Sequence, residues 1–233
     1  MHPTSDDLAA IDSTMSISDR ETGGRIRIWN RPSGEELLSR QPEVISVDVA
    51  DEGRFIATGS IDGKIHIWNM HDGSHLRATE IVKRLGRQTA SRLVFRPGTN
   101  IIASLGSGSY AYSVLLWDAQ TGRYEGRMSY VRNDFFSNVE CMRWSSNGQW
   151  LAAGCEGGGV MLWKADHAKP SLLHQTHSDS VASLTFTADG KNLVTSSADQ
   201  TTKLISAETG DVISTLDSEN IQTALVQASP SGR

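Results

Sequence analysis

Apolar and polar residues alternate along most of the chain with a period of two, which is typical of half-buried β-strands. The clearest stretch has three such runs, at 45–49, 54–60 and 64–68. Gly53 lies in the turn before the second run and Gly63 in the turn before the third. No segment shows the spacing of apolar positions that an amphipathic helix needs. The pattern therefore predicts an all-β chain.

A five-fold internal repeat runs through the chain. Each copy contains a β-branched or aliphatic run that ends in Trp and is followed by a polar residue and a Gly turn. The runs end at Trp29, Trp68, Trp117 and Trp163, and in a fifth, degenerate copy Ile205 stands in the place of Trp. The spacings are 39, 49, 46 and 42 residues, the length that four short strands and their turns require. Each copy is therefore expected to form one four-stranded unit.

The Trp-ending third strand, the Asp-Gly turn before it and the Gly turn after it together resemble the WD-repeat family of β-propellers. In that family each repeat makes one four-stranded blade, and the blades surround a central channel. The resemblance covers nearly the whole chain, although Trp117-Asp118 is its one literal Trp-Asp pair. It implies a single all-β propeller domain over residues 1–233 with about five blades. The approximate repeats are 1–43, 44–89, 90–137, 138–179 and 180–219.

The resemblance also implies a buried hydrogen-bonded set in each blade, made of a His before the first strand, a Ser or Thr on the second, an Asp in the next turn and the Trp. No repeat is complete, because the second has Arg40 at the His position and the fifth has Ile205 for Trp. We therefore expect blades that rely on apolar packing, with buried indole N–H groups bonded to other acceptors. The implied structural residues are Trp29, Ser60, Asp62, Trp68, Trp117, Asp118, Trp163, His177, Ser197 and Asp199.

Both ends of the chain match the same part of the repeat. Residues 1–10 align with the turn after a first strand, and residues 221–233 read as a first strand followed by that turn. Counting three strands in the first repeat, four in each of the next four and one at the end gives five blades. A closing strand at 220–228 would pair with the strand at 8–13 and complete a ring. The alternative is an open fragment of a longer propeller.

Composition excludes several classes of protein. The net charge of −5 argues against a general nucleic-acid binder. The chain has no long apolar window, no basic leader and no glycosylation acceptor, so we expect an intracellular protein, cytoplasmic or nuclear, with no membrane partner. Cys141 and Cys155 are too few for a disulfide framework and are expected to be small buried thiols. Trp150 aligns with Phe55 and Asn192 and is expected to be partly exposed.

Signatures of catalysis are missing from the sequence. It contains no nucleophile elbow, no metalloprotease helix motif and no phosphate-binding loop followed by a helix. The glycines at 157–159 lie between strands, which predicts a permissive turn. His167, His174 and His177 have no carboxylate or thiolate in phase with them, so we predict no metal site and no cofactor. We expect a protein without enzymatic activity.

Two long connections are the candidates for function. Residues 77–96 hold six Arg or Lys residues and one acidic residue, a local charge of +5 in a chain of −5. Residues 127–138 add Arg, Tyr and Phe, which are enriched in protein interfaces. Because such connections open on one face of adjacent blades, we expect their side chains to form one patch. The predicted partner-binding residues are Lys83, Arg84, Arg87, Arg127, Tyr130, Arg132, Phe135 and Phe136.

These features predict a non-catalytic scaffold for protein–protein interaction whose rigid blades hold binding loops in fixed positions. One alternative is solvated loops with one of the two Phe residues packed under the rim. An RNA-associated platform and an enzyme at the channel mouth are further alternatives. Another is recognition of an acidic or phosphorylated peptide, within a larger complex such as a ubiquitin ligase, by Lys83, Arg84, Arg87 and Arg132.

Overall fold

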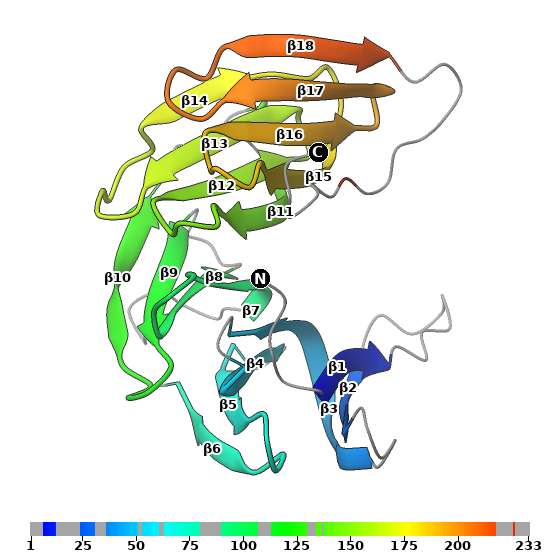
Figure 1. Ribbon diagram of the computed structural model, residues 1–233, viewed down its shortest axis with the longest axis vertical. Coiled ribbons are helices and arrows are strands. Elements are labelled where there is room, and N and C mark those ends of the chain that lie inside the picture. The colour runs from blue at the N-terminus through cyan, green and yellow to red at the C-terminus, as the bar shows by residue number, and fades with distance from the viewer. Residues whose placement is uncertain are drawn as a thin grey trace. The chain divides into compact units, whose positions relative to one another are not determined.

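The computed structural model describes residues 7–12, 24–30, 36–50, 53–60, 63–79, 90–106, 113–129, 134–136, 138–217 and 226. The chain divides into two compact units, Met1–Arg127 and Met128–Arg233, and each is described by itself. Eighteen β-strands make up the regular structure of these residues (Figure 1). The described part contains no helix, and so no helix that could cross a membrane. The all-β prediction is confirmed.

The strands alternate with short turns along the chain. Those of the first unit are β1 (Asp7–Asp12), β2 (Gly24–Asn30), β3 (Glu36–Val49), β4 (Phe55–Ser60), β5 (Ile65–Asn69), β6 (His75–Ala78), β7 (Ala90–Phe95), β8 (Ile101–Gly106), β9 (Ser113–Asp118) and β10 (Tyr124–Ser129), whose end extends into the second unit. Those of the second unit are β11 (Val139–Trp144), β12 (Trp150–Cys155), β13 (Gly159–Lys164), β14 (Leu172–Gln175), β15 (Val181–Phe186), β16 (Asn192–Ser197), β17 (Thr201–Ser206) and β18 (Val212–Asp217).

Each sheet is an antiparallel meander in which successive strands are neighbours. β7–β10, β11–β14 and β15–β18 form four-stranded sheets, as the repeat predicts, but β1–β6 form one sheet of six strands. The reason is β3, whose first half pairs with β2 and whose second half pairs with β4. Pro42 lies at the expected boundary near residue 43, and the pairing with β2 shifts register there, but the strand continues to Val49. The expected first two blades therefore share one sheet.

The repeat is visible in the register of the strands as well as in the sequence. In the repeats from residue 44 onward the first strand shifts register against the second at the same point, namely Val44/Ser46, Ala90/Arg92, Val139/Cys141 and Val181/Ser183. The turns after these strands carry Gly53, Gly98, Gly148 and Gly190, with φ between 63° and 69°. Glycine adopts this left-handed conformation without a Cβ clash, so the Gly turns determine where each hairpin closes.

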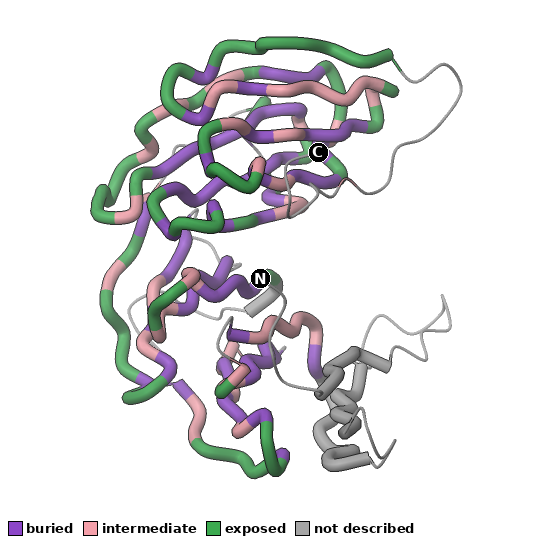
Figure 2. Tube along the Cα trace, in the orientation of Figure 1, coloured by how far each residue is buried: buried purple, intermediate pink, exposed green. Residues whose placement is uncertain are grey.

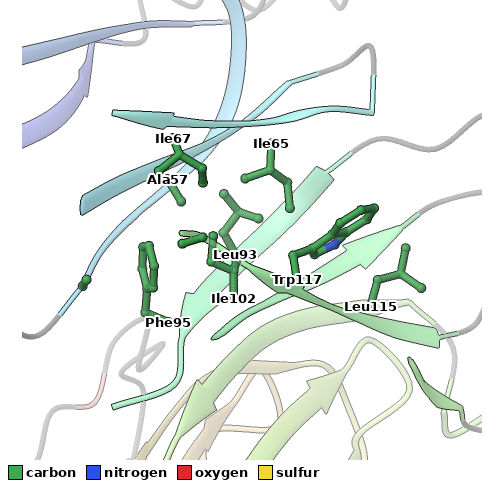
Figure 3. Packing of buried hydrophobic residues seen from close by; sticks show 10 residues of the cluster. Ala57, Ile65, Ile67, Leu93, Phe95, Ile102, Leu115 and Trp117 are labelled. Atoms are coloured by element: carbon green, nitrogen blue, oxygen red, sulfur yellow. The ribbon is translucent and has the colours of Figure 1, made fainter. Parts of the chain in front are cut away.

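Each unit buries a core between two facing sheets. In the first unit, Ile65 and Ile67 of β5 lie opposite Leu93 of β7 in a cluster that also contains Trp117 (Figure 3). In the second unit, residues of β12 and β13 pack against β15, β16 and β17. Full burial of one large aliphatic side chain contributes roughly 1.5–3 kcal/mol. Face-to-face packing of apolar strands is thus the main source of stability.

The outermost strand of the last sheet is not covered by the described residues. All six residues of β18 are exposed (Figure 2), whereas β12 is buried along its whole length. Burial therefore falls from the inner to the outer strands of the second unit.

Val226 shows where the C-terminal segment touches the last sheet. Its backbone N–H donates to Ser183 Oγ on β15 at 3.3 Å. Ser183 is the third residue of β15, and the third residue of β11, Cys141, donates its thiol to the carbonyl of Val181 at 3.3 Å. Val226 therefore contacts the third residue of β15, as Val181 of β15 contacts the third residue of β11. The predicted pairing of 220–228 with 8–13 lies largely outside the described residues, so ring closure stays a prediction.

Candidate functional site

Two buried tryptophans of the first unit bond to hydroxyl groups on the neighbouring second strand. Trp68 Nε1 donates to Thr58 Oγ1 and Trp117 Nε1 donates to Ser104 Oγ, each at 2.9 Å. Both hydroxyl residues are the fourth in their strands, β4 and β8. The sequence pointed to Ser60, which lies two residues beyond Thr58 on the same face of β4. The alternation of residues along β4 shows which face of the strand meets Trp68, and the hydrogen bond shows that Thr58 is the residue on that face that accepts it.

His177 is the centre of a hydrogen-bonded set in the second unit. Its Nδ1 lies 3.0 Å from Asp199 Oδ2 and 3.0 Å from Thr201 Oγ1. Its Nε2 lies 2.8 Å from the hydroxyl of Thr195, the fourth residue of β16. His177 and Asp199 therefore meet as the resemblance implies. The hydroxyl partner is Thr195; Ser197, the residue expected from the sequence, donates instead to the carbonyl of Asp179 at 2.9 Å.

Electrostatics keep this set in one protonation state. Burial lowers the pKa of His177, and the nearby Asp199 carboxylate only partly offsets that effect. Burial raises the pKa of Asp199, but hydrogen bonds from the Thr201 hydroxyl and the Ser178 and Thr201 amides outweigh it and hold the value at about 2. A neutral ring that donates from Nδ1 to Asp199 and accepts at Nε2 from Thr195 satisfies both nitrogens.

The buried position of this pair limits what it can do. The side chains of His177 and Asp199 are 0% and 6% exposed. A general base must reach the proton that it removes, and this imidazole is enclosed on both nitrogens. The set therefore holds the loop before β15 onto the turn after β16.

A glycine turn between β12 and β13 is held between two loops. A Cβ atom at Gly157 would overlap the carbonyl of Asp134, and one at Gly158 would overlap the carbonyl of His177. Gly158 also has φ of 84°, which favours glycine. The prediction of a permissive turn at 157–159 is confirmed, and the close approach of both loops is a second reason for these glycines.

The same turn orients the two predicted phenylalanines in opposite ways. Gly159 N–H donates to the carbonyl of Phe135 at 3.1 Å, and a Cβ atom at Gly159 would lie 2.6 Å from Phe136 Cδ1. Phe136 is buried, while Phe135 is 41% exposed. Phe136 thus anchors the loop, and Phe135 is presented to solvent from a fixed backbone.

The residues around Phe135 in the described rim are acidic. Asp134, Glu156 and Asp179 are exposed, and Asn138 Nδ2 donates to Glu156 Oε2 at 2.8 Å. Gln200, also exposed, has φ of 67°, which is uncommon for a residue with a Cβ atom. The basic residues Lys83, Arg84, Arg87 and Arg132 lie outside the described residues, so the basic patch expected from the sequence stays a prediction.

The remaining predicted residues lie in four different environments. Arg127 is exposed at the end of β10. Asp118 accepts hydrogen bonds from the amide and hydroxyl of Thr121, at 2.6 and 2.9 Å, so it orders the turn after β9. Trp163 is buried in β13, and Trp29 lies in β2 with its side chain outside the description. Outside the described residues altogether lie Asp62, Lys83, Arg84, Arg87, Tyr130 and Arg132.

Trp150 differs from expectation because it packs in the apolar core cluster of the second unit. It is buried, with 9% of its surface exposed, and Lys164 Nζ lies over its ring, 5.3 Å from the centroid. The alignment with Asn192 therefore misjudged its burial. Beside Trp150 lies a polar cleft of about 630 Å³ within the second unit, lined by the turns at 147–150, 189–192 and 206–208 and by Lys164.

Models of known protein families match three segments of the chain. A model described as "WD domain, G-beta repeat" matches residues 37–69 and 131–164. A model described as "Anaphase-promoting complex subunit 4 WD40 domain" matches residues 171–228. The matches fall on parts of both units, so the repeated pattern extends beyond any one sheet.

Curated proteins with similar sequences are longer than this chain. A WD repeat-containing protein 91 homolog of Dictyostelium discoideum is 24% identical over 181 residues, which cover 76% of this chain and 23% of that protein. Eukaryotic translation initiation factor 3 subunit I of Eremothecium gossypii is 22% identical over 205 residues, covering 82% of this chain and 58% of that protein. The chain thus spans between about a quarter and somewhat over half of these relatives.

Among solved structures, a chain in "Crystal Structure of Mitotic Checkpoint Complex" matches with a TM-score of 0.72 and 21% identity. The match covers 86% of this chain and 60% of that chain. At this identity the likeness concerns the fold, and it identifies the sheets as propeller blades.

Proposed function

Because this chain belongs to the WD-repeat family of β-propellers, we propose that it is a non-catalytic platform that binds other proteins through the loops at the edges of its blades. Propellers of this family serve in general as interaction scaffolds. Rigid sheets that hold short loops in place reduce the ordering entropy that binding costs.

The observation that carries the proposal is the presentation of Phe135. Its backbone carbonyl is bonded to Gly159, its neighbour Phe136 is buried, and its own side chain is 41% exposed. An aromatic side chain on a fixed backbone gives a large apolar contact for little loss of freedom, which is typical of residues that dominate protein interfaces. By contrast, the one His–Asp pair of the second unit described above is enclosed and serves the structure.

Affinity purification of the tagged full-length chain from its own cells, with chemical cross-linking, tests the role of Phe135. The variant Phe135→Asp is compared with Leu173→Asp, which alters a 43% exposed side chain on β14 of the same unit. We expect Phe135→Asp to lower recovery of cross-linked partners by about tenfold or more, and Leu173→Asp to leave it unchanged. Equal recovery in both variants, or equal loss, would contradict a site at Phe135.

A second candidate function is recognition of an acidic or phosphorylated segment within a larger assembly, such as a ubiquitin ligase. It rests on Lys83, Arg84, Arg87 and Arg132, and on relatives whose names describe a subunit of a translation factor and a structure of a checkpoint complex. Arg binds phosphate in bidentate geometry, so a charge-reversed pair should lose such a ligand. The double variant Arg84→Glu/Arg87→Glu is expected to lose capture of acidic partners while keeping partners that depend on Phe135; retention of the acidic partners would refute this site.

A further inference from the structure

A pair of histidines lies on the first sheet, beside Trp68. His66 of β5 and His75 of β6 approach each other so that His66 Nδ1 is 3.1 Å from His75 Nε2. Their ring centroids are 5.2 Å apart, and the ring of His75 stands edge-on to Trp68 at 4.7 Å. His66 is half-buried and His75 is exposed. Two imidazole nitrogens therefore converge at a point that solvent can reach.

The internal repeat places apolar residues at the level of His66 in the next two sheets, and Lys203 in the last sheet, where it is paired with Thr195. His66 is paired with Thr58, and the residues at the same level of the next two sheets are Leu115, paired with Ser104, and Met161, paired with Ala153. Both are fully buried apolar residues.

The second member of the pair, His75, also has a counterpart on the next sheet. On the next sheet Tyr124 stands edge-on to Trp117, with centroids 5.6 Å apart, as His75 does to Trp68. His66 and His75 therefore stand at the positions that Leu115 and Tyr124 have on the next sheet.

We propose that His66 and His75 form a two-imidazole site for a divalent transition-metal ion of the Zn²⁺, Cu²⁺ or Ni²⁺ class. Imidazole nitrogen is a preferred ligand for these ions. Two nitrogens at Zn–N distances near 2.05 Å in a tetrahedral site lie roughly 3.3 Å apart, close to the 3.1 Å that separates this pair. Without an ion, one of these two nitrogens donates its proton to the other in a hydrogen bond; when an ion binds, that proton moves to the second nitrogen of its own ring, so that both facing nitrogens can bind the ion.

The pair supplies two ligands, and the rest of the coordination shell is left to water or to a group from a bound partner. No group of three or more His, Cys, Asp or Glu side chains in the described structure is arranged to hold a metal. The site is therefore open on the solvent side. An open site of this kind takes up an ion more weakly than a closed four-ligand site.

The test is titration of the full-length, untagged chain with Zn²⁺ alone and with Cu²⁺ alone. Zn²⁺ binding is followed by calorimetry, and Cu²⁺ binding by electron paramagnetic resonance, which counts nitrogen ligands. We expect one ion to bind at this site, with two imidazole nitrogens in the Cu²⁺ spectrum. Cu²⁺ should also quench part of the tryptophan fluorescence, because Trp68 lies against His75.

Variants separate this site from other histidines. The double variant His66→Leu/His75→Tyr copies the residues of the next sheet and should fold while losing the site, with affinity lowered by about tenfold or more. The control His71→Ala alters an exposed histidine of the same hairpin and should bind as wild type does. His2 is a further histidine of the chain, so His2→Ala is included as a second control. Binding by the double variant equal to that of wild type, or loss in His71→Ala alone, would overturn the proposal.

Discussion

The sheets β7–β10 and β15–β18 place a hydroxyl at the same level of their second strand and use it in different ways. In the first, Ser104 Oγ accepts a hydrogen bond from the indole N–H of Trp117. In the second, Thr195 bonds to the imidazole of His177, and the Trp position is filled by Ile205. The hydroxyl is thus common to both sheets, and its partner differs. A Trp alone or a His alone is therefore enough to give the buried hydroxyl a hydrogen-bond partner.

The largest effect in this comparison is expected from removing the imidazole. His177→Leu takes from the Thr195 hydroxyl its partner in a buried place and removes one of the hydrogen bonds to Asp199, so it should lower the free energy of unfolding by about 2–3 kcal/mol. Urea denaturation followed by circular dichroism measures the change. Asp211→Asn, at an exposed carboxylate of the same sheet, is the control and should have little effect. Equal stability of the two variants would show that the set contributes nothing.

Removing the hydroxyl of the other sheet should cost less. Ser104→Ala leaves the indole N–H of Trp117 without its acceptor, and we expect a loss of about 1–2 kcal/mol by the same measurement. Ser104→Thr keeps an oxygen at that position and serves as the control. If the alanine and threonine variants unfolded at the same urea concentration, the hydrogen bond from the Trp117 indole would contribute nothing to the free energy of unfolding.

Only one of the two sheets should respond to mild acid through its hydrogen-bonded set. The folded protein holds the pKa of His177 below its ordinary value of 6.5, so at falling pH the unfolded chain takes up a proton first. The stability from the neutral ring is complete above pH 6.5 and is lost as pH falls from 6.5 toward the lowered value. As the pH is lowered from 7.5 to 5, the urea concentration at the midpoint of unfolding should fall more steeply for wild type than for His177→Gln. An equal fall in both proteins would contradict this prediction.

The smallest expected effect is a gain. Gln200 has φ of 67° in the turn after β16, where the turn after β12 has Gly158 with φ of 84°. Gln200→Gly removes the strain of a left-handed residue and should stabilise the protein by up to about 1 kcal/mol after the entropy cost of glycine. The reverse change, Gly158→Gln, should destabilise it strongly. Thermal unfolding of both variants tests this prediction. A lower midpoint temperature for Gln200→Gly than for wild type would show that the backbone at Gln200 is not strained.

The strands were largely predictable because their signals are local. The run that ends at Trp117 corresponds to β9, and the Gly turns lie where φ is positive. The boundary near residue 43 was not predictable in this way. There the chain has Pro42, and only the pairing of β3 with both neighbours shows that the strand continues.

The candidate site was predictable only in part. The sequence identified two adjacent phenylalanines, but burial of Phe136 and exposure of Phe135 depend on the turn at Gly159, some twenty residues further on. The His66–His75 pair gave no sequence signal either, because the two residues meet across strands and a register shift sets which residues are opposite.

The all-β class, the repeat period and the turns follow from the sequence alone, because alternation and glycine act over a few residues. Which hydroxyl accepts the indole bond, which phenylalanine is buried and which histidines meet depend on the packing of the strands. The physical reason is that side chains two apart on a strand share one face and look alike in sequence, while packing against a second strand distinguishes them. Thr58 and Ser60 illustrate this, because one accepts the bond from Trp68 and both lie on the same strand.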